Sequence, residues 1–110
     1  MLIYKILRGA EWAALQDMAE TPGAPIDVAD GFIHFSTAAQ AEETAAKHFA
    51  GEEGLWLLTL EAETLEALKW EPSRGGQLFP HLYGPLRLAD VIAAAPLPVD
   101  DGRHIFPELA

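Results

Sequence analysis

The sequence predicts a small single α+β domain over residues 1–110, with a curved and mainly antiparallel sheet and two to three helices. The length allows one hydrophobic core and is too short for two. Half of the residues are apolar, which excludes a disordered chain. Strand-like and helix-like segments follow one another without a parallel βαβ unit or a glycine-rich phosphate loop, so an antiparallel sheet is favoured.

The first third of the chain predicts a strand, a helix and a loop. Residues 2–7 are of strand length, and alternation places Lys5 on one face with apolar neighbours. Residues 10–19 carry apolar side chains at helical spacing, and a Thr-Pro-Gly sequence at 21–23 ends that helix. Residues 23–30 are interpreted as a loop or a short extended piece that leads into the next strand.

Residues 30–51 are the best-patterned stretch, and they predict a short strand followed by a helix. Thr37 and Gln40 have the spacing of a capping box, which marks the start of the helix. His34 and Ser36 share one face of the strand, because side chains alternate. They lie where the strand meets a helix N-terminus, whose free N–H groups suit an anion or a polar ligand.

The second half predicts further strands around an apolar loop. Residues 55–60 form a continuous apolar run, which is typical of a strand buried on both faces in the middle of a sheet. Residues 61–68 predict one short helix and residues 69–71 a brief strand. Residues 73–87 are rich in Gly and Pro, yet they also carry large apolar and aromatic side chains and a histidine. This combination predicts a loop that packs over a site. The last strand is expected near residues 91–95.

The strongest patterns also predict the core. The apolar side of the helix within residues 30–51 is expected to bury Phe49. The strands are expected to contribute Ile33, Phe35, Leu57 and either Trp56 or Leu58.

Composition excludes several classes of function. The formal net charge is −10, and the seven Lys and Arg residues form no cluster, so nucleic-acid binding is not expected. The apolar run at the start is interrupted by charges, which is unlike a signal peptide or a membrane span, so a cytoplasmic protein is predicted. There is no cysteine, and the four histidines lack metal-ligand spacing, so no metal is predicted.

Residues with useful chemistry fall in two segments, and we expect one pocket between the strand end at His34 and the loop at His81. Simpler interpretations exist: the histidines bridge segments by hydrogen bonds, and Ser36 caps the helix. The double glycine after Arg74 suits either a phosphate or a hairpin turn. His48 is interpreted as a surface residue. The polar candidates are His34, Ser36, Thr37, Glu71, Arg74, His81, Tyr83 and Arg87.

Five segments in this order, LIYKIL, EWAAL, DGFIHFSTAAQAEETAAKHFAG, KWEPSRGG and FPHLYGPL, resemble the small bacterial domain-of-unknown-function family 952. The resemblance covers nearly the whole chain. The fold of that family is described as similar to the ADP-ribosyltransferase superfamily, whose diphtheria-toxin-like members use NAD. The resemblance therefore implies an ADP-ribosyltransferase-like fold with a pocket for NAD or a related nucleotide.

The resemblance also implies roles for individual residues. In such enzymes a strand carries H-x-[ST], whose histidine contacts the cofactor ribose, and His34 and Ser36 stand at these positions. Tyr83 or Phe79 would stack on nicotinamide, and Glu71 would be the acid. An enzyme of this kind would transfer ADP-ribose or hydrolyse an N-glycosidic bond. The implied catalytic residues are His34 and Glu71, and the implied ligand-binding residues are Ser36, Thr37, Arg74, Phe79, His81 and Tyr83.

Two alternatives stay open on the same fold. One is a non-catalytic module that binds another small metabolite. The other is a protein-interaction domain in which the histidines are structural. Fold analogy does not separate them, because one fold hosts many functions.

Overall fold

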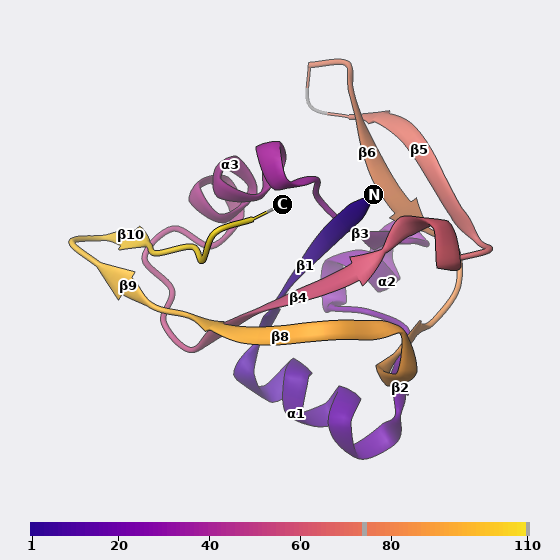
Figure 1. The fold of residues 1–110 in the computed structure, drawn as a ribbon, viewed down its shortest axis with the longest axis horizontal. Helices are drawn as coiled ribbons and strands as arrows, with labels where there is room; N and C mark the ends of the chain where they lie inside the picture. Colours follow the sequence, from indigo (N-terminus) through magenta and orange to yellow (C-terminus); the bar gives the residue numbers. More distant parts are fainter. Residues whose placement is uncertain (74, 110) are drawn as a thin grey trace.

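Two antiparallel sheets form the body of the molecule in this computed structural model, which describes residues 1–73 and 75–109 (Figure 1). The first sheet has the order β1-β4-β8 and the second has the order β3-β6-β5. They are joined where Tyr4 and Ser36 exchange backbone hydrogen bonds of 2.8 and 2.9 Å. The strands are β1 (Leu2–Arg8), β4 (Leu55–Glu61), β8 (Val91–Leu97), β3 (Ile33–His34), β6 (Gln77–Leu82) and β5 (Leu68–Ser73).

The described residues also form three α-helices, so the predicted α+β class with mainly antiparallel sheets is confirmed. None of these helices is long and apolar enough to cross a membrane. The helices are α1 (Gly9–Met18), α2 (Pro25–Asp30) and α3 (Ala38–His48), and the 3₁₀ turns are η1 (Ala62–Thr64) and η2 (Leu88–Asp90). Two short strand pairs complete the fold: β2 (Glu20–Thr21) with β7 (Leu86–Arg87), and β9 (Val99–Asp100) with β10 (Arg103–His104).

The sheet β1-β4-β8 is buried on both faces, as the apolar run in β4 predicts. Leu58 and Leu60 pack in a core cluster that contains Leu15 of α1. Leu55 and Leu57 point to the opposite face and pack in a second cluster that contains Ala45 of α3. The helices α1 and α3 accordingly lie on different sides of this sheet in Figure 1. A strand between two apolar layers shows no alternation of polar and apolar residues.

The predicted core is confirmed in part. Ile33, Phe35, Leu57 and Leu58 are all buried. Phe49 is only partly buried, because it lies at the C-terminal end of α3, where the Arg8 guanidinium stacks 5.0 Å from its ring centroid. The apolar side of α3 reaches the core mainly through its alanines.

The expected loop at residues 23–30 is wrong, because Pro25–Asp30 forms α2. Proline is favoured in the first turn of a helix, where its missing N–H has no intrahelical partner. The helix expected at residues 61–68 is also wrong: only the turn η1 forms there, and Leu68 already begins β5.

The expected loop at residues 73–87 is largely wrong as well, because Gln77–Leu82 forms β6 in the middle of the second sheet. Pro80 is tolerated there because β6 pairs with β3 only at His81 and Leu82, so Pro80 lies beyond that ladder. Its carbonyl still accepts the N–H of Phe35 at 3.0 Å.

Truncation of Leu58 should be far more destabilising than truncation of Phe49. Leu58→Ala should lower the free energy of unfolding by about 3 kcal/mol or more, because the side chain has no exposed surface. Phe49→Ala should cost about 1–2 kcal/mol, since the ring is only partly buried and packs at the edge of the core. Urea denaturation measures both. A larger loss for Phe49→Ala would contradict this description of the core.

Candidate functional site

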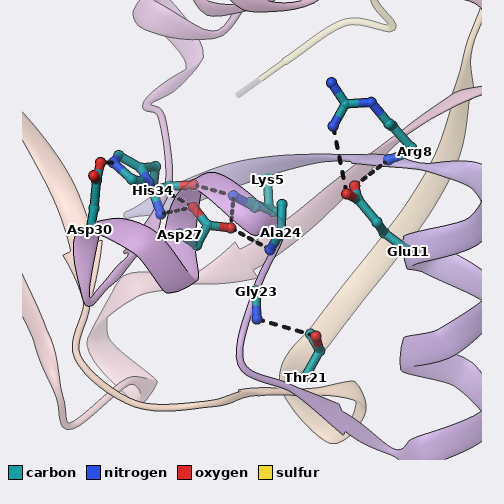
Figure 2. Close-up of polar contacts among 9 residues, drawn as sticks. All are labelled: Lys5, Arg8, Glu11, Thr21, Gly23, Ala24, Asp27, Asp30 and His34. Carbon is teal, nitrogen blue, oxygen red and sulfur yellow. Dashed lines mark hydrogen bonds and ion pairs between the residues drawn. The ribbon is translucent and has the colours of Figure 1, made fainter.

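A buried carboxylate, that of Asp27 in α2, lies at the centre of a polar network (Figure 2). Its Oδ2 accepts hydrogen bonds from Nζ of Lys5 at 2.8 Å and from the backbone N–H of Ala24 at 2.7 Å. Its Oδ1 accepts from the backbone N–H of His34 at 3.0 Å and lies 2.6 Å from Nδ1 of the His34 ring. One side chain therefore holds together β1, β3 and the start of α2.

The local sequence around the start of α2 places Asp27 at the centre of this network. Pro25 begins α2, and Asp27 two residues later reaches back to the N–H of Ala24, which precedes the helix. Gly23 lies against the Asp27 side chain with φ of +111°, and a Cβ on Gly23 would come within 2.6 Å of the Cβ of Asp27. Glycine is needed here on both counts.

Lys5 supplies the countercharge from inside the first sheet. Its side chain is only 7% exposed, and Nζ donates to Asp27 and, at 3.0 Å, to the backbone carbonyl of His34. Burial lowers the pKa of Lys5, and the Asp27 charge opposes this shift. A cation buried among apolar residues is destabilising without such partners, so Lys5 and Asp27 depend on each other.

Asp27 is ionised, and its charge determines which nitrogen of the His34 ring carries a proton. Burial alone would raise the pKa of Asp27, but the hydrogen bond from His34 and the charge of Lys5 outweigh it and lower the pKa to about 2. The carboxylate can only accept, so Nδ1 of His34 carries a proton and donates. In a neutral ring, Nε2 is then an acceptor.

Nε2 of His34 faces a second carboxylate, at 2.9 Å from Oδ2 of Asp30. This contact is a hydrogen bond only when the ring is doubly protonated, because an unprotonated Nε2 and the Asp30 carboxylate oxygen are both acceptors. Asp30 is 43% exposed and the His34 side chain is 33% exposed. The Asp30 carboxylate can therefore turn into solvent and leave Nε2 to another partner.

The second histidine lies directly opposite the first. His34 and His81 are paired residues of β3 and β6, and their ring centroids are 5.5 Å apart, which confirms the expectation that they lie close together. Nδ1 of His81 lies 2.9 Å from Oε1 of Glu71, and the Tyr83 hydroxyl donates to the same oxygen at 2.7 Å. The Tyr83 and His81 hydrogen bonds lower the pKa of Glu71, and the Glu71 carboxylate raises the pKa of Tyr83.

Nε2 of His81 has no hydrogen-bond partner among the residues that the structure describes. Its side chain is 6% exposed, and within the part of the chain that the structure describes its hydrogen bonding involves Nδ1 alone. Because Glu71 is ionised and accepts from Nδ1, Nε2 of a neutral His81 is an acceptor. An acceptor at this position can take a hydrogen bond from a donor group of a ligand.

Phe32 stacks over both histidines. Its ring centroid lies 4.2 Å from that of His81, 4.6 Å from that of His34 and 5.2 Å from that of Tyr83. Phe32 directly precedes β3 and Tyr83 directly follows β6, each two residues from the histidine of that strand, so the extended backbone directs each pair to the same side. We call Phe32, His34, His81 and Tyr83 the four-ring cluster.

A groove of about 570 Å³ runs beside the four-ring cluster. Val28 of α2, Phe32 and Tyr83 contribute to its walls, and Glu20 lies on its lining. The two imidazoles are not among its lining residues, whereas Phe32, which contacts both, is. A smaller cavity of about 310 Å³ is lined by none of the four rings and shares Leu82, Gly84 and Pro85 with the groove.

Four of the sequence-predicted site residues come together at this cluster: His34, Glu71, His81 and Tyr83. Ser36 is buried against α3 instead, with its hydroxyl 2.8 Å from that of Thr44.

The remaining candidates lie elsewhere. Thr37 precedes α3, and its N–H donates to the Gln40 side chain at 3.0 Å, which is the reach-back half of the predicted capping box. Phe79 is 4% exposed, so its ring offers no open surface for stacking. Arg74 lies outside the described residues. Arg87 belongs to the lining of the smaller cavity.

Sequence reasoning missed Lys5, Asp27, Asp30 and Phe32. Two signals point to them. A proline followed two residues later by an aspartate is the pattern of a helix start. A lysine on the same strand face as Ile3 and Leu7 is a buried cation that requires an acidic partner. Among the described residues, no group of three or more acidic or histidine side chains is arranged to hold a metal ion.

Comparison with known proteins identifies the family. A family model described as "Protein of unknown function (DUF952)" matches residues 6–94. The chain belongs to the DUF952 family. No curated protein matches the chain. The DUF952 assignment confirms the family expected from the sequence segments.

Solved structures of one protein are similar to this DUF952 chain over nearly its whole length. The crystal structure of protein CC0527 from Caulobacter crescentus shows 53% identity and a TM-score of 0.92, covering 96% of this chain and 94% of that chain. The solution NMR structure of CC0527 shows 53% identity and a TM-score of 0.84, covering 94% and 90%. The descriptions of these structures name no ligand. The ADP-ribosyltransferase-like assignment and the nucleotide pocket therefore stay predictions.

Acid should remove the stabilisation that Asp27 provides. The pKa of Asp27 is about 2 in the folded protein against an ordinary value of 3.8, so folding favours the ionised form. The stabilisation is complete above about pH 4 and is lost as the pH falls toward 2, and it amounts to about 2 kcal/mol. Urea denaturation between about pH 7 and pH 3 measures this loss.

Asp27→Asn is the matched variant for that experiment. It should cost about 3–5 kcal/mol near pH 7, because Lys5 stays buried without its countercharge. The difference in unfolding free energy between wild type and Asp27→Asn should then shrink below about pH 4. A difference that stays constant down to about pH 3 would contradict an ionised Asp27.

Proposed function

We propose that this DUF952 chain binds a nicotinamide nucleotide, NAD or a part of it, in the groove beside the four-ring cluster. One observation carries the proposal. His34, fixed by the Asp27 carboxylate, faces His81 across two paired strands, and the aromatic rings of Phe32 and Tyr83 form walls of the adjoining groove. The segments DGFIHFS and FPHLYGP resemble family 952, and the described similarity of that family's fold to the ADP-ribosyltransferase superfamily implies the same ligand class.

The two histidines suit the ribose of such a ligand. With Nδ1 donating to a carboxylate, each neutral ring has Nε2 left as an acceptor. Two neighbouring acceptors match the hydroxyl groups of a ribose, which act as donors. For His34 the ribose hydroxyl would take the place of Asp30, whose carboxylate is partly exposed. For His81 the approach requires a shift of the Phe32 ring that covers it.

The nicotinamide ring would lie against Tyr83, which is 41% exposed and lines the groove. Stacking on a flat aromatic surface is worth about 0.5–1.5 kcal/mol beyond the area buried. In this proposal Tyr83 is the platform, and Phe79 has only a packing role because it is buried.

Turnover at this site would use Glu71. Its lowered pKa keeps the carboxylate ionised at neutral pH, and a negative charge stabilises the positive charge that a ribose ring develops when its N-glycosidic bond breaks. The reactions to assay are N-glycosidic bond hydrolysis and ADP-ribosyl transfer.

Binding without turnover is the alternative, favoured by the fact that Oε1 of Glu71 already accepts from both His81 and Tyr83. Release of nicotinamide from NAD by the wild type but not by Glu71→Gln would support catalysis. Absence of release despite binding would assign the chain to a binding module.

His34→Ala should abolish the thermal shift that NAD produces, while lowering unfolding stability by only about 1 kcal/mol. The cost is small because Asp27 keeps Lys5, the Ala24 N–H and a backbone N–H as donors. Thermal melts with and without NAD, ADP-ribose and nicotinamide provide the measurement.

His48→Ala is the control, since His48 is an exposed histidine on α3. It lies outside the four-ring cluster and the groove lining, so its replacement should leave the ligand-induced shift unchanged. A wild-type protein that none of the three compounds shifts, or a His34→Ala variant that binds as tightly as wild type, would overturn the proposed function.

A further inference from the structure

We propose that the groove selects a ligand by the positive charge of a planar ring: it takes an N-substituted pyridinium or a similar aromatic cation, and it rejects the neutral ring and free phosphate groups. This inference rests on the proposed function and specifies which part of the ligand is recognised. It is argued from the charges around the groove, from the two aromatic walls and from the lack of Lys and Arg among the described lining residues.

The groove and the four-ring cluster are surrounded by negative charge. The charged residues of the lining are Glu20 and the already paired Asp27; no Lys or Arg is found among the described lining residues. Asp30 contacts His34 and Glu71 contacts Tyr83. The formal net charge of the chain, −10, adds a field of the same sign.

The buried groups that could hold an anion are already bonded within the protein. Lys5 is buried and bonded to Asp27 and to the His34 carbonyl. The N–H of Ala24 at the start of α2, which could otherwise hold an anion, donates to Asp27. Lys69 lies over Tyr83 on the exposed side of β5. The exposed Lys69 and Arg87, the latter paired with Glu20 across β2 and β7, are not among the described lining residues. A pyrophosphate on the lining itself would therefore meet Glu20 without a Lys or Arg beside it.

The aromatic walls favour a cation in the same place. An aromatic face attracts a cation through its quadrupole. The Tyr83 hydroxyl donates to a carboxylate at 2.7 Å, which leaves its ring richer in electron density. The protein's own Lys69 ammonium lies 4.9 Å from the Tyr83 ring centroid, so this ring already attracts a positive charge in the folded chain. A cationic ring can contact Tyr83 and Phe32 and be attracted by Glu20 together.

The experiment compares two ligands that differ by one methyl group and one charge. Binding of 1-methylnicotinamide and of nicotinamide is followed by NMR titration, together with NAD and ADP-ribose. The cation should bind roughly tenfold more tightly than the neutral ring, and its affinity should fall with added salt. ADP-ribose, which lacks the ring, should bind more weakly than NAD.

Glu20→Gln tests the electrostatic part with a surface substitution. It should weaken 1-methylnicotinamide binding several-fold and leave nicotinamide binding unchanged. Glu42→Gln, which removes an exposed charge on α3, is the matched control and should change neither affinity.

The outcomes separate this inference from the proposed function. Equal affinity for 1-methylnicotinamide and nicotinamide, or equal affinity for NAD and ADP-ribose, would overturn charge selection while leaving nucleotide binding in place. Binding of 1-methylnicotinamide without binding of NAD would support charge selection and contradict the proposed function. No binding of any of the four compounds would overturn both.

Discussion

The carboxylate of Asp27 connects the fold to the site. A buried carboxylate and a buried ammonium are each destabilising unless hydrogen bonds and opposite charge replace the lost water. Here Asp27 accepts from Lys5 of β1, from Ala24 at the start of α2 and from His34 of β3. These bonds hold a groove wall, α2, against the strand that carries the first histidine. The pairing of β3 with β6 then places the second histidine opposite it.

The same interaction decides the chemistry at the surface. Lys5 and Asp27 neutralise each other inside the molecule, so the charge that a ligand meets comes from Glu20, Asp30 and Glu71. An ionised Asp27 also determines which nitrogen of His34 carries the proton and which one is left for a ligand. Protein stability, histidine orientation and ligand charge therefore depend on one buried ion pair.

The sequence predicted what local pattern and alternation control. It gave the α+β class, the central β4 and the closeness of His34 and His81 correctly. It missed features that depend on tertiary partners. The sequence places Pro25 and Pro80 in loops, yet Pro25 begins α2 and Pro80 lies within β6. The buried position of Lys5 is explained only by its partner Asp27, which lies 22 residues away in the sequence.

The most direct measurement is the position of the proton on the His34 ring, read from imidazole ¹⁵N chemical shifts and ¹H–¹⁵N couplings at about pH 8.5, above the ordinary titration range of histidine. If Asp27 is ionised and holds Nδ1, the neutral ring carries its proton on Nδ1, and Nε2 shows the shift of an acceptor nitrogen. Asp27→Asn should change this pattern at His34 and leave that of the Glu71-bound His81 unaltered. A wild-type His34 ring that carries its proton on Nε2 and none on Nδ1, or a pattern that Asp27→Asn does not change, would contradict the account.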